Sequence, residues 1–176
     1  LELAMACDYR VALETEKRIL GLPEVQLGIH PGFGGTVRAV RIAGVRPAMQ
    51  LMLTGKPINV SKARKIGLID RVSSADGWRS AAQELIAARP PLKKAPLVER
   101  LLSLPVVRPF IRNVLIKQVA GKARKEHYPA PYAIIDLWSR HGASTRTARP
   151  GTSHRIAMAS NPHCACQRWA PSIVTR

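Results

Sequence analysis

The chain has few acidic residues, few aromatic residues and few cysteines, and it lacks a long apolar run. Its 176 residues include 11 Asp and Glu against 28 Lys and Arg, while aromatic residues make up 5% and cysteine occurs three times. Three cysteines without a regular framework do not indicate a disulfide-stapled secreted protein. No apolar run reaches the roughly 18 residues that a membrane-spanning helix needs. We therefore expect a soluble, cytoplasmic protein with a hydrophobic core.

The net charge of +17 raises the question of nucleic-acid binding. The basic residues are scattered through stretches with helical periodicity. They are not interleaved with aromatic side chains that would stack on bases, and no known DNA-binding motif contains them. We therefore expect no specific nucleic-acid partner. A basic nucleic-acid binder stays open as the alternative that charge alone supports.

Acidic residues stop at Asp136, and the composition changes soon afterwards. Residues 141–176 contain five Arg and three His but no Asp, Glu or Lys. Helical periodicity also stops there, so we expect this tail to be disordered. A shifted reading frame after Trp138 explains the change in composition, and a genuine basic tail is the alternative. We accordingly divide the chain into a catalytic-type part (residues 1–90), a helical connecting region (91–140) and the tail (141–176).

The most informative segment is residues 21–36, which places Glu24 among apolar residues and follows it with a glycine-rich turn. A carboxylate in apolar surroundings is costly to keep ionised, which favours proton transfer. The glycine turn, from Gly32 to Gly35, precedes a predicted helix. Bare N–H groups at a helix N-terminus attract an oxygen with negative charge. Together, the acid and the turn indicate an active site.

A second carboxylate, Glu2, also has apolar neighbours. We expect Glu2 and Glu24 to face each other across a short strand pair. Two carboxylates in different surroundings can then divide acid and base roles. The alternative is that both are ordinary solvated surface residues.

A coarse reading gives an α/β fold class. We expect strands at residues 9–12 and 18–22, joined by a polar turn, and a third strand at 68–72. We expect helices at residues 36–42, 47–53, 61–67 and 76–88, and near 97–102, 109–119 and 131–139. Ser61 is the expected cap of the helix at 61–67, and Asp76 is the expected cap of the helix at 76–88. Met49, Leu51 and Met52 are expected in the core.

Several ordered motifs resemble one family. They are Glu2-Leu3-Ala4, the block from Leu22 to Thr36, Leu53-Thr54-Gly55 and Gly67-Leu68-Ile69-Asp70-Arg71-Val72. These motifs are similar to those of the crotonase, or enoyl-CoA hydratase/isomerase, family. Residues 28–38 look most like the hydratase part of the multifunctional alpha subunits of fatty-acid oxidation, which also carry a 3-hydroxyacyl-CoA dehydrogenase. The resemblance implies part of a spiral of strand-strand-helix (ββα) units, followed by C-terminal helices.

The resemblance also implies roles for individual residues. Glu2 would help activate a water that attacks C3 of a trans-2-enoyl-CoA, and Glu24 would exchange the proton at C2. Gly32 would position the water through its backbone N–H. The implied reaction is a reversible syn hydration to a 3-hydroxyacyl-CoA, with acyl-CoA as substrate and with no metal or other cofactor. The implied protein partners are further copies of the chain or a thiolase beta subunit.

One departure from the family pattern concerns the oxyanion hole. The family builds it from two backbone N–H groups upstream of the first glutamate, whereas this sequence starts one residue before Glu2. We therefore expect a truncated hydratase. Losing one such donor typically costs roughly a hundred- to a thousandfold in rate, so an inactive remnant is one alternative. An enoyl-CoA isomerase, or another acyl-CoA enzyme with this fold, is the other.

Overall fold

The computed structural model describes residues 1–143, and most of the predicted tail (141–176) lies outside the described residues. Two single 3-10 helical turns, η1 (Ala4–Ala6) and η2 (Pro23–Leu27), and two short strands, β1 (Val11–Leu13) and β2 (Arg71–Ser73), accompany the α-helices. The helices are α1 (Gly35–Ala43), α2 (Val45–Thr54), α3 (Val60–Lys65), α4 (Trp78–Ala88), α5 (Leu97–Leu102), α6 (Arg108–Ala120) and α7 (Pro129–His141). The predicted helices are therefore confirmed, with shifts of a few residues at their ends.

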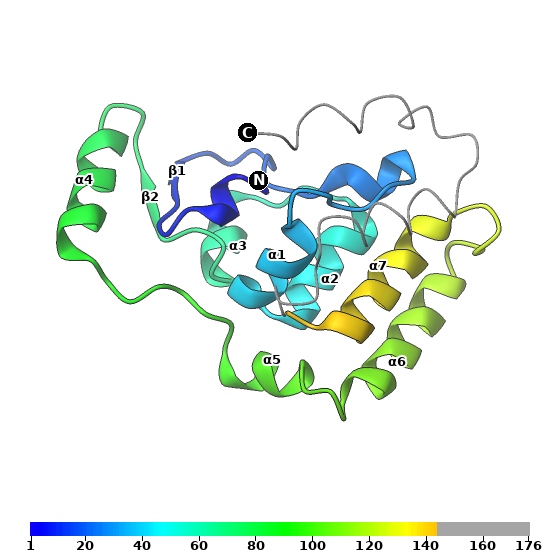
Figure 1. The fold of residues 1–176 in the computed structure, drawn as a ribbon. Coiled ribbons are helices and arrows are strands. Elements are labelled where there is room, and N and C mark those ends of the chain that lie inside the picture. Colours follow the sequence, from blue (N-terminus) through cyan, green and yellow to red (C-terminus); the bar gives the residue numbers. More distant parts are fainter. Residues whose placement is uncertain (144–176) are drawn as a thin grey trace, which may run out of the picture.

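The core lies between the consecutive helices α1 and α2 and the helix α7, which comes from a distant part of the chain and packs on both (Figure 1). Met49, Leu51 and Met52 of α2 are at most 2% exposed, which confirms their predicted place in the core. Ile134 and Trp138 of α7 complete the same apolar cluster. Because these side chains recur at helical spacing, each helix presents one apolar face to the others. The helices after residue 90 thus share one core with α1 and α2.

The two strands form a parallel pair, in the register Val11 with Arg71 through Leu13 with Ser73. The sequence led us to expect strands at 9–12 and 18–22 joined by a polar turn. Only the first becomes a strand, and its partner comes from residues 71–73. Leu20 forms only an isolated antiparallel bridge with Ile58. The expected segment at 18–22 is therefore wrong as a strand, because its backbone groups find one partner instead of a ladder.

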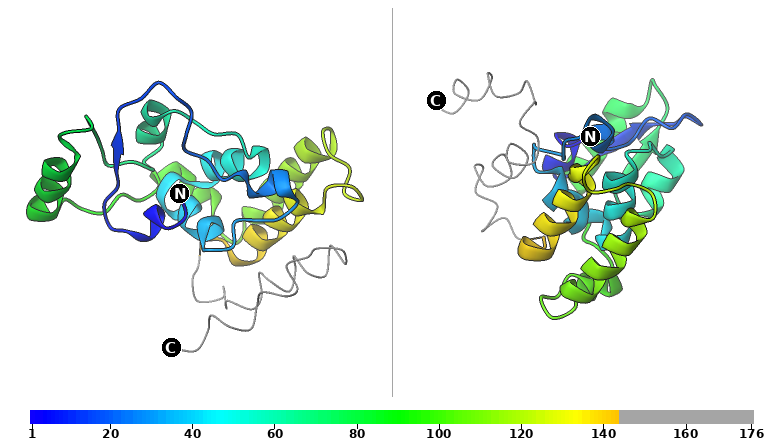
Figure 2. Two further views of the ribbon diagram at one scale, coloured as in Figure 1. Left: turned by 90° about the horizontal axis from the view of Figure 1, so that it is seen from above. Right: turned by 90° about the vertical axis from the view of Figure 1, so that its right-hand side faces the viewer.

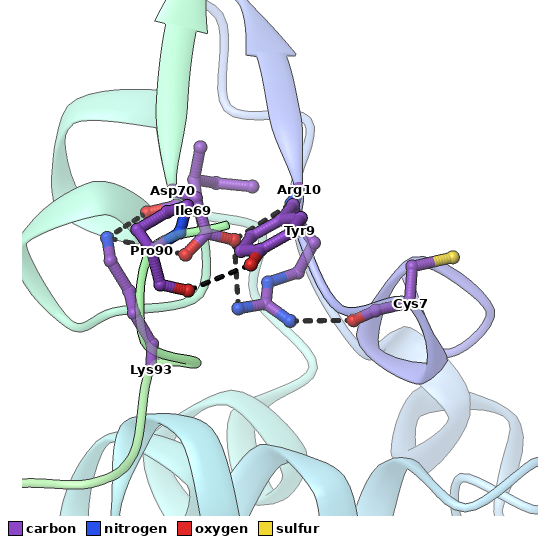
Figure 3. A network of polar contacts seen from close by, with 7 residues as sticks. All are labelled: Cys7, Tyr9, Arg10, Ile69, Asp70, Pro90 and Lys93. Carbon is purple, nitrogen blue, oxygen red and sulfur yellow. Dashed lines mark hydrogen bonds and ion pairs between the residues drawn. The ribbon is translucent and has the colours of Figure 1, made fainter. Parts of the chain in front are cut away.

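A polar network holds the start of β1 against the segment before β2 (Figure 3). The Arg10 guanidinium pairs with Asp70 at 2.9 Å, and both side chains are at most 8% exposed. Asp70 Oδ2 also accepts a bond from the Arg10 backbone N–H at 2.8 Å. Lys93 Nζ donates to the Ile69 carbonyl at 2.6 Å, while the Tyr9 hydroxyl donates to Pro90 O at 2.8 Å. This network fixes the extended segment after α4 to the body of the protein.

Two predicted helix caps are wrong. Asn59 caps α3, because its Oδ1 accepts a bond from the Lys62 backbone N–H at 2.9 Å, so Ser61 lies inside the helix. At α4 the N-cap position is Gly77, whose N–H donates to Ser74 Oγ at 3.3 Å, and Asp76 makes no capping bond. In both places a neighbouring residue that also favours caps is better placed.

Helix α4 lies at one end of the molecule and α6 at the other (Figures 1 and 2). Helix α4 packs on β1 and β2, yet Trp78 is 45% exposed and Ile86 is 63% exposed. Helix α6 packs on α7, where Arg112 pairs with Asp136 at 2.7 Å, but leaves Phe110 71% exposed. Both helices therefore present apolar side chains to solvent. Among residues 1–143, no helix is long and apolar enough to cross a membrane.

Candidate functional site

Glu2 lies just before η1, which packs against α1, and its side chain is nearly buried. Its Oε1 accepts a hydrogen bond from the Gly35 N–H at 2.6 Å, and its Oε2 accepts one from the Phe33 N–H at 3.2 Å. A carboxylate is stabilised at a helix N-terminus by these N–H groups and by the helix dipole. The sequence predicted that the glycine turn would offer free N–H groups to a ligand. Two of them instead bind the carboxylate of Glu2.

The glycines of the turn allow this close approach. A Cβ built on Gly35 would lie 2.5 Å from Glu2 Oε1 and 3.0 Å from Glu2 Cγ. Gly34 precedes α1 with a φ of +89°, in the left-handed region that favours glycine. Each glycine is therefore required by the local structure: Gly34 adopts the positive φ of the turn, and Gly35 leaves room for the Glu2 carboxylate.

Gly32 lies at the exposed end of the same turn. A Cβ there would meet only the His30 carbonyl oxygen, at 4.0 Å, so packing does not require glycine at this position. Within residues 1–143 the Gly32 N–H has no protein acceptor. The preceding His30 is buried, with Nδ1 lying 3.3 Å from Pro31 O. An open N–H on a fixed turn is able to bind a water molecule or a ligand oxygen.

Glu24 lies in the first turn of η2, after Pro23. Its side chain is partly buried, and its Oε2 is buried without a hydrogen-bond partner. A buried carboxylate oxygen without a partner is costly, so each such group in a folded protein needs an explanation. An unmet carboxylate acceptor is suited to take part in proton transfer with a bound molecule.

The structure does not place the two glutamates across a strand pair, so that expectation is wrong. Glu2 precedes η1, Glu24 belongs to η2, and the only ladder within residues 1–143 joins β1 to β2. Glu2 is instead held against the turn that contains Gly32. Glu24 is positioned separately, because η2 packs on α2.

Gln26 is a positioning residue that the sequence reasoning missed. Its Nε2 donates to the Gly55 carbonyl at 3.1 Å, which fastens η2 to the end of α2. Gly55 has a φ of +62°, and a Cβ there would lie 2.8 Å from Gln26 Cγ. The Leu53-Thr54-Gly55 motif therefore helps to hold the segment that carries Glu24. A lone glutamine gives no sequence signal for such a contact, since its partner lies 29 residues away.

No group of three or more potential metal ligands occurs within residues 1–143. The candidate residues Glu2, Glu24 and Gly32 contribute two carboxylates and a backbone N–H group. These groups can accept, donate and move protons around a bound oxygen atom.

Comparison with known proteins gives a consistent result. The family model for enoyl-CoA hydratase/isomerase matches residues 1–131. The fatty acid oxidation complex subunit alpha of Shewanella loihica is 45% identical over 140 residues, which cover 77% of this chain and 20% of that protein. The subunit of the same name from Vibrio cholerae serotype O1 is 40% identical over 144 residues, which cover 78% of this chain and 20% of that protein. The chain thus spans about a fifth of the length of these curated relatives.

Solved structures include a carnitinyl-CoA dehydratase from Mycobacterium avium 104. It is 40% identical to this chain, with a TM-score of 0.45, and the match covers 49% of this chain and 33% of that one.

Proposed function

This chain belongs to the enoyl-CoA hydratase/isomerase family, and on that premise we propose that it supplies the two carboxylates of an enoyl-CoA hydratase of fatty-acid oxidation. Its described part is a piece of the crotonase-like α/β fold, with one parallel strand pair and the C-terminal helices. The proposed substrate is a trans-2-enoyl-CoA and the proposed product is the 3-hydroxyacyl-CoA.

The proposed reaction adds water across the C2–C3 double bond. Glu2 orients the water and accepts its proton while the water oxygen bonds to C3. Glu24 delivers a proton to C2, so the product gains one hydroxyl and one hydrogen. Gly32 N–H holds the water oxygen. The reverse reaction uses the same groups in opposite roles, and no metal or redox cofactor is proposed.

The buried Oε2 of Glu24, which has no partner, is the observation that carries this proposal. Glu2 is fixed by two N–H groups, and Glu24 is held on a turn fastened by Gln26. One carboxylate is thus anchored and the other has an oxygen available for a proton. A pair that differs in this way suits a reaction with one proton acceptor and one proton donor.

Further copies of the chain and a thiolase beta subunit are proposed partners, on the strength of the alpha-subunit relatives. We also propose that the chain divides into the end of a hydratase domain (residues 1–90), a helical connecting region (91–140) and a tail (141–176).

An enoyl-CoA isomerase is the second candidate, favoured by the same difference between the carboxylates. Isomerisation of a 3-enoyl-CoA needs one base that removes a proton from C2 and returns it to C4. Glu24 alone could do this, because Glu2 already accepts two backbone hydrogen bonds.

Two variants and two substrates separate the candidates. We expect Glu24→Gln to lower both hydration and isomerisation by about a hundredfold or more. Glu2→Gln should lower hydration similarly if the chain is a hydratase, but it should spare isomerisation if the chain is a one-base isomerase. Glu16→Gln is the matched control, because Glu16 is exposed and lies outside both turns. Full activity of Glu24→Gln on both substrates would contradict both candidates.

A further inference from the structure

A concave site lined by basic side chains lies between η1, α1 and the segment before α5, and one of its lining residues, Arg38, also donates to the Phe33 carbonyl of the glycine turn. The cavity has a volume of about 670 Å³, within the range of small-molecule sites. It is bounded by the segment around Cys7, by the second half of α1, by the segment before α5 and by α5 itself. Six cationic side chains line it: Arg10, Arg38, Arg41, Lys93, Lys94 and Arg100.

The positive charge of this cavity is largely unneutralised. Asp8 is the one carboxylate in its lining. Asp70, which is outside the lining, pairs with Arg10 at 2.9 Å and lies 3.8 Å from Lys93. In the described part of the chain, Arg38, Lys94 and Arg100 form no ion pair. A concave surface lined by one sign of charge concentrates its field on a bound counter-ion.

A buried polar atom in the lining points to a ligand as well. The Arg10 side chain is 4% exposed, and two of its nitrogens bond to Asp70 and to the Cys7 carbonyl. Its third nitrogen, Nε, is buried with no partner. Figure 3 shows Arg10 between Cys7 and Lys93, which also line the cavity. An acceptor oxygen in the cavity would give this N–H group the bond it lacks.

We propose that this cavity binds an oligophosphate, a ligand that carries two or more linked phosphate groups. Arginine matches phosphate oxygens with paired N–H donors, and lysine adds a point charge. The lining offers both kinds, spread over three separate chain segments. Arg38 comes from α1, whereas Lys94 and Arg100 come from the segment before α5 and from α5 itself, so a ligand with two or more phosphate groups can engage more of these three cations than a single phosphate can. The cavity is also too small to enclose a nucleic-acid duplex.

The test uses the 176-residue protein and inorganic pyrophosphate, with binding followed by calorimetry at fixed ionic strength. We expect saturable binding of one pyrophosphate, tighter than that of orthophosphate. The double variant Lys94→Gln with Arg100→Gln should weaken binding by about tenfold or more, since it removes two unpaired cations. It leaves the Arg10–Asp70 pair intact. The matched control is Arg64→Gln with Lys65→Gln, which removes two exposed cations from α3, outside the cavity.

Equal weakening by the two double variants would overturn the proposal, because it would show a general effect of net charge. Absence of saturable binding, or equal affinity for orthophosphate and pyrophosphate, would overturn it too. Competition by free CoA would assign the site to the diphosphate of a CoA compound, and lack of competition would assign it to a free oligophosphate. None of these measurements depends on turnover, so they stand apart from the test of the proposed hydratase.

Discussion

The contact between Glu2 and Gly35 permits a sharp test of how the glycine turn is built. Changing Gly35 to Ala places a Cβ 2.5 Å from Glu2 Oε1, a distance that real Cβ contacts essentially never show. The carboxylate must move, and the hydrogen bonds from the Gly35 and Phe33 N–H groups, at 2.6 and 3.2 Å, are lost or stretched. Hydrogen bonds to a charged group contribute about 1.5–3 kcal/mol each, and crowding of a packed site costs about 1–3 kcal/mol.

Alanine has a higher helix propensity than glycine, and this difference stabilises α1 by about 1 kcal/mol, which offsets part of the loss. We therefore expect Gly35→Ala to lower the free energy of unfolding by about 3 kcal/mol or more. Urea titration followed by circular dichroism measures this difference. Gly32→Ala is the control, because a Cβ there meets only an oxygen at 4.0 Å, and its cost should stay within about 0.5 kcal/mol.

A double-mutant cycle isolates the contact itself. In a Glu2→Ala background the obstacle to a Cβ is gone, so Gly35→Ala should cost less than about 1 kcal/mol there. Equal costs of Gly35→Ala in the two backgrounds would show that the contact with Glu2 does not set the cost. So would equal costs of Gly35→Ala and Gly32→Ala in the unmodified chain.

Three further predictions concern stability, each measured by urea titration. Asp70→Ala should cost about 3–5 kcal/mol, because it leaves the buried Arg10 without its partner, and a cost below about 1 kcal/mol would contradict the network in Figure 3. Asn59→Ala should cost about 1 kcal/mol and Ser61→Ala under about 0.5 kcal/mol, and the reverse order would show that Ser61 is the cap after all. Trp138→Ala should lower the free energy of unfolding by about 3–5 kcal/mol, because it leaves a cavity in the core. Trp138→Phe should lower it far less, because phenylalanine keeps most of the ring and lacks the buried Nε1–H that has no partner. Equal losses for the two variants would contradict this.

The sequence predicted the helices well because their signals are local. The apolar spacing of Met49 and Met52 indicated the buried face of α2, and Gly55 marked its end with a positive φ. The change from helix to linker after Ala88 was equally visible. Such periodicity and breaker signals need no knowledge of distant partners.

The errors arose where a distant partner decides the structure. Val11–Leu13 pairs with Arg71–Ser73, which lies 60 residues further on, and no local pattern specifies that choice. Asn59 and Ser61 are both good cap residues, and only the path of the chain decides between them. The glycine turn was predicted to hold a ligand oxygen, whereas two of its N–H groups bind the carboxylate of Glu2. The sequence could not predict that Glu2 binds there, because Glu2 lies 33 residues before Gly35.

The central claim is that Glu24 transfers a proton to an enoyl-CoA as water adds to it. The most direct measurement incubates the 176-residue protein with crotonyl-CoA in heavy-oxygen water and follows the label in the 3-hydroxyacyl product by mass spectrometry. We expect labelled product above the buffer rate, with a loss of about a hundredfold or more in Glu24→Gln but not in Glu16→Gln. Equal labelling by Glu24→Gln and the unmodified chain, or none above buffer from either, would contradict it.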